Sequence, residues 1–117
     1  MKRISSLKSF VGPSTIKTLA SAATLQVPEG DSVFFVSGTT GVASIVVENG
    51  RTGRLIELIG EDVSATSIAF TDTAIASAAP GTISLAGSLT LARGESVRLR
   101  QLKSGGWVEQ SRSSAIA

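Results

Sequence analysis

The chain has 117 residues and a formal net charge of +2, and it contains no cysteine and no histidine. The length fits one domain. The missing residue types exclude disulfides, thiolate metal sites and the commonest general base. Only four Phe and one Trp are aromatic, so we expect a core of small aliphatic side chains. Such a core suits thin, closely stacked layers and points to burial that is shared between chains.

The first 22 residues differ from the rest in charge and pattern. They hold four basic residues and no acid, whereas the remainder holds seven basic and nine acidic residues. Lys8, Pro13 and Lys17 interrupt every apolar run that a secretion signal needs. No run approaches the length of a membrane span, and four dilute charges bind nucleic acid only weakly. We interpret residues 1–22 as a basic flexible arm or linker and residues 23–117 as the domain. We expect neither nucleic-acid binding nor membrane insertion.

From residue 24 onward, short apolar runs alternate with turns rich in glycine. Leu25 and Val27 lie on one side of a predicted half-buried strand. The run 33–36 is apolar throughout, which predicts a strand that is covered on both faces.

The next two strands are predicted over residues 42–47 and 54–59. Asn49 and Gly50 lie between them, and this pair is the strongest short hairpin signal in the chain. Further on, residues 73–82 contain alanines and a Pro-Gly pair, which predict an irregular loop. The remaining strands are expected around Ile68 and Phe70, Ile83 and Leu85, Leu89 and Leu91, and Val97 and Leu99.

The last part of the domain has the pattern strand, turn, strand. Val97 and Leu99 alternate with arginines, a Lys-Ser-Gly-Gly turn follows at 103–106, and Trp107 opens the final run. In total about nine strands are predicted, with turn signals every 8–12 residues. The sequence therefore predicts an all-β domain of short strands and Gly-rich turns, either a β-sandwich or β-prism or a β-helix-like fold.

The polar residues show no pattern that is typical of a catalytic or metal site. Most of the nine acids lie in predicted turns, where carboxylates usually cap or form the turn rather than face each other as a catalytic pair. The serines and threonines have no histidine as a base. Glu61 and Asp62 are the densest acid pair but lack the other ligands of a calcium loop. We predict no catalytic residue, no metal site, no cofactor and no enzymatic activity.

Two features near the end of the chain each have two interpretations. Arg98 and Arg100 share one face of a strand, which fits either nucleic acid or an exposed face whose arginines pair with acids. We favour the exposed face, because Trp107 is the only aromatic residue nearby. Trp107 itself fits either a sugar-stacking platform or the cap of a core, and a lone Trp after a Gly-Gly turn more often caps a core.

Five stretches in order give the domain a family resemblance: ATLQVP at 23–28, DSVFFVSGTT at 31–40, GRLIELI at 53–59, ISLAGS at 83–88 and GWVEQSRS at 106–113. Together they resemble the C-terminal domain at the tips of phage tail spikes and tail fibres. The resemblance implies a β-rich domain that packs as a parallel homotrimer, helps the spike to assemble and in some members touches host surface glycans. It also implies a place in the virion tail, after synthesis in the bacterial cytoplasm.

In that family a spike body precedes the domain, whereas 22 residues precede it here, so we expect an excised domain or a separately made one. The first hypothesis is a non-enzymatic assembly domain that caps a spike; the alternative is a carbohydrate-binding module, and a small hydrolase is a third. Candidate carbohydrate contacts are Trp107, Glu109 and Arg112. The candidates for the buried trimer core are Phe34, Phe35, Ile45, Val47, Leu55 and Leu58.

Overall fold

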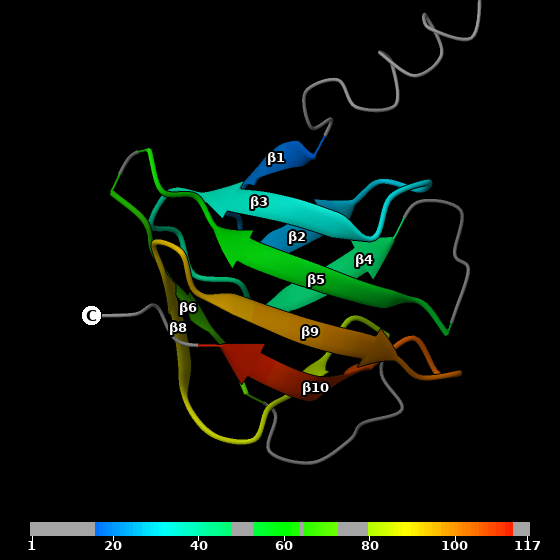
Figure 1. The fold of residues 1–117 in the computed structure, drawn as a ribbon. Helices are drawn as coiled ribbons and strands as arrows, with labels where there is room; N and C mark the ends of the chain where they lie inside the picture. Colours follow the sequence, from blue (N-terminus) through cyan, green and yellow to red (C-terminus); the bar gives the residue numbers. More distant parts are fainter. Residues whose placement is uncertain (1–15, 48–52, 64, 73–79, 114–117) are drawn as a thin grey trace, which may run out of the picture.

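A computed structural model describes residues 16–47, 53–63, 65–72 and 80–113 of the chain. These residues form strands and no helix, which confirms the all-β prediction (Figure 1). The strands are β1 (Lys17–Ala20), β2 (Thr24–Val27), β3 (Val33–Ser37), β4 (Ser44–Val47), β5 (Leu55–Gly60), β6 (Ser67–Phe70), β7 (Ile83–Ser84), β8 (Leu89–Ala92), β9 (Ser96–Gln101) and β10 (Trp107–Ser113). No helix among the described residues has the length and apolarity needed to cross a membrane.

The strands form two layers that face each other (Figure 1). The front sheet has six strands in the order β1-β3-β5-β9-β10-β7. Behind it lie the parallel pair β2-β4 and the antiparallel pair β6-β8, which we call the rear strands. Because β1, β3 and β5 are parallel neighbours and β2 and β4 are the strands between them in sequence, the chain winds from front to rear and back. This arrangement resembles a short β-solenoid.

The core lies between the two layers and follows from the alternation of side chains along each strand. In the front sheet, Phe34 of β3 pairs with Leu58 of β5, which pairs with Val97 of β9, and all three side chains are buried. Behind them, Leu25 of β2 pairs with Ile45 of β4, and both face inward. Most of the core residues are aliphatic, and Phe34, Phe70 and Trp107 are its aromatic members.

The prediction that the strands before and after Asn49-Gly50 pair as a hairpin is wrong. β4 pairs with β2 in the rear layer, whereas β5 pairs with β3 and β9 in the front sheet. The two residues themselves lie outside the described residues, as do positions 73–79 of the predicted loop. A local turn signal fixes a reversal only where burial also favours it, and here parallel stacking of β5 on β3 buries Leu58 against Phe34. The strand, turn and strand predicted at the end of the domain are present, and the two strands, β9 and β10, are antiparallel neighbours.

The front sheet also begins earlier than the sequence predicted. Lys17–Ala20 form β1, within the segment that was interpreted as an arm, and pair in parallel with β3. The sequence gives little warning of this strand, because three of its four residues are exposed and its pairing is made by backbone groups. The first 15 residues lie outside the described part of the chain.

The six candidates for a buried trimer core fall into three groups. Phe34, Ile45 and Leu58 are fully buried within the single chain, and Val47 packs against that core while partly exposed. Phe35 and Leu55 lie on the outer face of the front sheet and are half-buried. The prediction that β3 is covered on both faces is therefore wrong within one chain, since only its inward residues are buried.

Candidate functional site at the last strand

The three residues predicted to contact carbohydrate all lie on β10, and a β-bulge decides how they are presented. The pairing of β10 with β9 shifts register between Glu109 and Ser111. In a regular strand, positions 109 and 112 would face opposite sides. The extra residue of the bulge turns Arg112 to the same side as Glu109. The structure therefore brings two of the three predicted residues together.

Glu109 and Arg112 form a two-pronged ion pair. Arg112 donates from Nε to Glu109 Oε2 at 2.6 Å and from Nη2 to Glu109 Oε1 at 2.7 Å. The Glu109 side chain is only 4% exposed and that of Arg112 is 33% exposed. Such paired, charge-assisted hydrogen bonds fix orientation as well as adding energy.

The same two side chains bind the loop that precedes β8. Glu109 Oε1 accepts a hydrogen bond from the Ala86 backbone N–H at 2.8 Å. Arg112 donates to the carbonyl oxygens of Ser88 at 2.8 Å and Gly87 at 3.1 Å. The pair therefore works as a clamp that joins β10 to the loop at 85–88. We call these two side chains the β10 clamp.

The electrostatics of the β10 clamp follow from this geometry. The hydrogen bond from Arg112 lowers the pKa of Glu109, and burial of the carboxyl opposes that shift without reversing it. The hydrogen bond to Glu109 in turn raises the pKa of Arg112. Both groups are therefore held in their charged forms, and most of their hydrogen-bonding groups are already used within the chain.

Trp107 lies in the core, where it is 1% exposed. Its indole Nε1–H donates to the Ile45 carbonyl oxygen at 3.0 Å, which ties the front sheet to a rear strand. Because protein atoms cover the ring, the stacking of a sugar on Trp107 does not fit this geometry. The core-cap interpretation of Trp107 agrees with the burial and the hydrogen bond.

A hollow of about 170 Å³ lies beside the β10 clamp, lined by Thr90, Glu95, Arg112 and neighbouring residues. Whether Glu109 and Arg112 contact carbohydrate stays a prediction, and the structure gives them a clear role within the fold.

The remaining charged side chains were considered in the sequence as metal ligands or as an exposed basic face. Within the described ranges, no group of three or more acidic side chains is placed to hold a metal ion. Arg98 lies 3.7 Å from Glu57 of the neighbouring strand, and Arg100 donates to the Gly53 carbonyl oxygen at 3.2 Å. These contacts agree with the interpretation of the arginines as an exposed face that pairs with neighbouring groups.

One residue that the sequence analysis did not single out is Gln101, at the end of β9. Its side chain is buried beside a cavity, and its amide oxygen has no hydrogen-bond partner. Its only sequence signal is the alternation of β9, in which position 101 follows the inward residues Val97 and Leu99.

Comparison with known proteins does not identify a family for this chain. The chain matches no family model, no curated protein and no solved structure.

Proposed function

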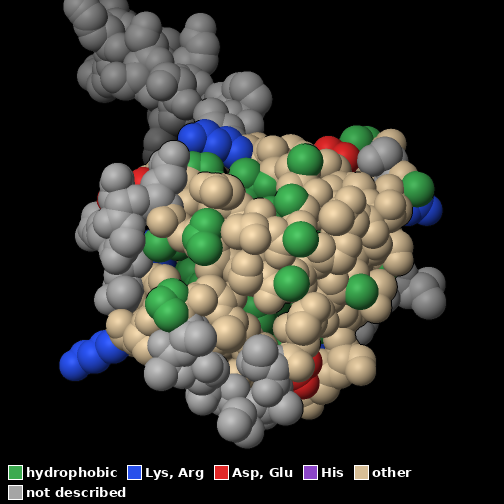
Figure 2. All heavy atoms as spheres, turned by 180° about the vertical axis from the view of Figure 1, so that it is seen from behind, with side chains coloured by type: hydrophobic (Ala, Val, Ile, Leu, Met, Phe, Trp, Pro, Cys, Tyr) green, Lys and Arg blue, Asp and Glu red, His purple; other side chains and the backbone are tan. Residues whose placement is uncertain are grey.

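We propose that this chain is a non-enzymatic assembly domain that forms a homotrimer and closes the host-facing end of a phage tail spike or fibre. The observation that carries the proposal is the uncharged surface of the rear strands. The sequences of β2, β4, β6 and β8 contain no charged residue. From behind, neutral side chains and backbone fill the surface and charged atoms lie around its margin (Figure 2).

The composition of the rear surface favours close packing against other copies. Its outward positions are small or neutral, as with Thr24, Ser44, Ala69 and Thr90. Burying such side chains carries no cost of removing charge from water. The core of a protein interface is likewise depleted of charged residues. A three-fold arrangement of copies would cover this surface and leave the front sheets outside, together with Phe35 and Leu55 on their outer face.

The two ends of the front sheet differ, and this difference supports the proposal that the domain closes one end of a spike. At one end the β10 clamp holds the loop at 85–88 against the last strand. At the other end β1 is the outermost strand of the front sheet (Figure 1). An outermost strand offers backbone groups to a further strand. A preceding spike body would stack its last turn on this end, while the clamped end would face away from it.

The test compares two matched substitutions on the two layers. Ala69 of β6 and Ala20 of β1 are both exposed strand residues, and they face the rear and the front respectively. We expect the unaltered chain to have a mass near three times 11.9 kDa by light scattering on a sizing column. Ala69→Lys places a charge in each rear interface and should give a monomer, whereas Ala20→Lys should remain a trimer.

Circular dichroism of both variants separates loss of assembly from loss of fold. A folded Ala69→Lys variant that stays trimeric would show that the rear surface is not the interface. An unaltered chain that is monomeric at every concentration would overturn the assembly role itself.

A further inference from the structure

The front sheet ends in two edge strands, β7 and β1, which differ in length (Figure 1). β7 has two residues and β1 has four. An unpaired strand edge is a template for pairing with another chain, and a very short edge strand avoids such pairing. Among the described residues, no strand pairs with the outer edge of β1. This edge is therefore where another strand could extend the sheet.

The register places Lys17 on the inward side of β1. Lys17 pairs with Phe34, which pairs with Leu58, and residues paired in this way point to the same face of a sheet. Leu19, two residues further along β1, packs against the core, in agreement with this orientation. The row across the sheet consists of Lys17, Phe34, Leu58 and Val97. The last three are fully buried, whereas Lys17 is exposed and charged.

Lys17 keeps its charge in contact with water at the end of this row. Its Nζ lies 3.6 Å from Asp31 Oδ2, and the two side chains are 55% and 41% exposed. An ion pair that is exposed to this degree contributes little to stability. The stability of the single chain therefore gives no reason for a charge where the neighbouring strands carry apolar residues, and the open edge does.

Pairing with a second copy of the chain would bury this charge. Two identical edges meet about a two-fold axis, which makes the two β1 strands antiparallel. When inward residues stay on one face, Thr18 lies opposite Thr18 of the second copy, and Lys17 lies opposite Leu19 of that copy. Each added strand would cover the ammonium group of Lys17. Removing a charge from water without a new partner is strongly unfavourable.

We propose that the edge of β1 is a latent pairing surface for a second copy of this chain, and that Lys17 keeps it closed. An inward-pointing charge on an edge strand is one of the ways in which proteins prevent such pairing. The inference goes beyond the assembly role, because this contact joins the ends of two sheets and does not involve the rear strands. In a trimer, three β1 edges would meet three others, so the joined form is a hexamer.

The test compares Lys17→Val with Thr18→Val, a matched control in which the same residue is placed on the outward side of β1. Light scattering on a sizing column gives the mass of each variant over a range of concentrations. We expect Lys17→Val to have twice the mass of the unaltered chain and Thr18→Val to have the same mass. Asp31→Asn should also keep the unaltered mass, because it leaves the ammonium group in place.

A disulfide locates the new contact, since the chain contains no cysteine of its own. In the Lys17→Val background, Thr18→Cys should give a covalent pair of chains on oxidation, because position 18 lies opposite itself in the joined strands. The same Cys in the unaltered background should give far less of this product.

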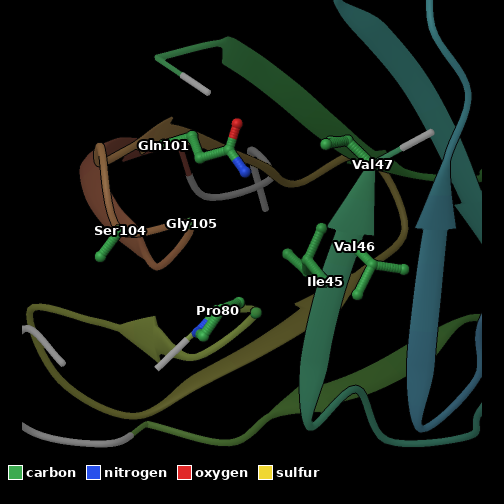
Figure 3. A pocket seen from close by; sticks show the side chains of 8 residues that line it. Ile45, Val46, Val47, Pro80, Gln101, Ser104 and Gly105 are labelled. Atoms are coloured by element: carbon green, nitrogen blue, oxygen red, sulfur yellow. The ribbon is translucent and has the colours of Figure 1, made fainter. Parts of the chain in front are cut away.

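Trp107 fluorescence reports whether each variant keeps its core. The indole N–H donates to the carbonyl oxygen of Ile45, a residue beside the cavity at the end of β4 (Figure 3). A variant whose core has opened would expose Trp107 and shift its emission to longer wavelength. If Lys17→Val behaves so, Lys17→Thr takes its place, with the same twofold mass expected.

Three results would overturn the proposal. One is a folded, neutral variant at position 17 that keeps the unaltered mass. Another is an equal doubling by Thr18→Val or Asp31→Asn. The third is a doubled Lys17→Val species that forms no disulfide through position 18. The ratio is taken to the unaltered chain, whose own mass separately decides whether the domain is a trimer, so failure of one proposal is distinguishable from failure of the other.

Discussion

The front sheet and the rear strands have the same inward pattern but present different surfaces to solvent. On both layers, aliphatic residues at alternate positions fill one core, as with Leu58 in front and Ile45 behind. Outward, the front sheet carries Glu57, Arg98 and Arg100, which contact neighbouring groups, whereas the rear strands carry no charge. Core packing constrains only every second residue of a strand. The outward positions are therefore free to differ, and the neutral rear surface is the feature on which the proposed assembly role rests.

The largest expected effect on stability comes from placing a charge on the inner face of the front sheet rather than on its outer face. Leu58 and Ile59 are neighbours in β5, but Leu58 is fully buried and Ile59 is half-buried on the outer face. Leu58→Asp places an unpaired carboxylate in the core and should abolish cooperative folding. Ile59→Asp should cost roughly 1 kcal/mol, because its carboxylate stays in contact with water. Thermal unfolding followed by circular dichroism measures both, and equal losses would contradict the assignment of the two faces.

The second prediction concerns the link between the two layers. Trp107→Phe removes the indole donor and leaves the buried Ile45 carbonyl oxygen without that partner. We expect a loss of about 2 kcal/mol in the free energy of unfolding, from the lost hydrogen bond and the smaller ring. Urea unfolding provides the measurement. A loss under about 0.5 kcal/mol would mean that the layers are held together by apolar packing alone.

The smallest effect concerns the β10 clamp and depends on pH. The pKa of Glu109 is lower in the folded chain than its ordinary value of 4.5. The charged Glu109 side chain therefore contributes its full stabilisation above pH 4.5. This stabilisation is lost as the pH falls from 4.5 through the lower pKa that Glu109 has in the folded chain. At pH 7 we expect the free energy of unfolding of the unaltered chain to be about 1 kcal/mol larger than that of the Glu109→Gln variant. The difference should shrink at pH 3 in parallel urea titrations, and a difference that is constant with pH would exclude the carboxylate as its source.

Much of the fold could be predicted from the sequence because strand alternation is a local property. Leu25 and Val27, Ile68 and Phe70, and Val97 and Leu99 all occupy the inward positions that their spacing indicated. The closing hairpin was also predicted correctly, since β9, its short turn and β10 are adjacent in the chain. Fewer features of the candidate site could be predicted. Trp107, Glu109 and Arg112 were recognised as a group, but their mutual orientation was not.

What the sequence by itself determined is the all-β class, the positions of most strands and the inward residue of each. These depend on periods of two residues and on glycine turns, which act over a few positions. Only the tertiary structure decided that β4 pairs with β2 instead of β5, that a bulge turns Arg112 toward Glu109, and that Gln101 lies unsatisfied beside a cavity. Each of these depends on segments far apart in the chain. Their contacts become favourable only when the whole core is buried at once.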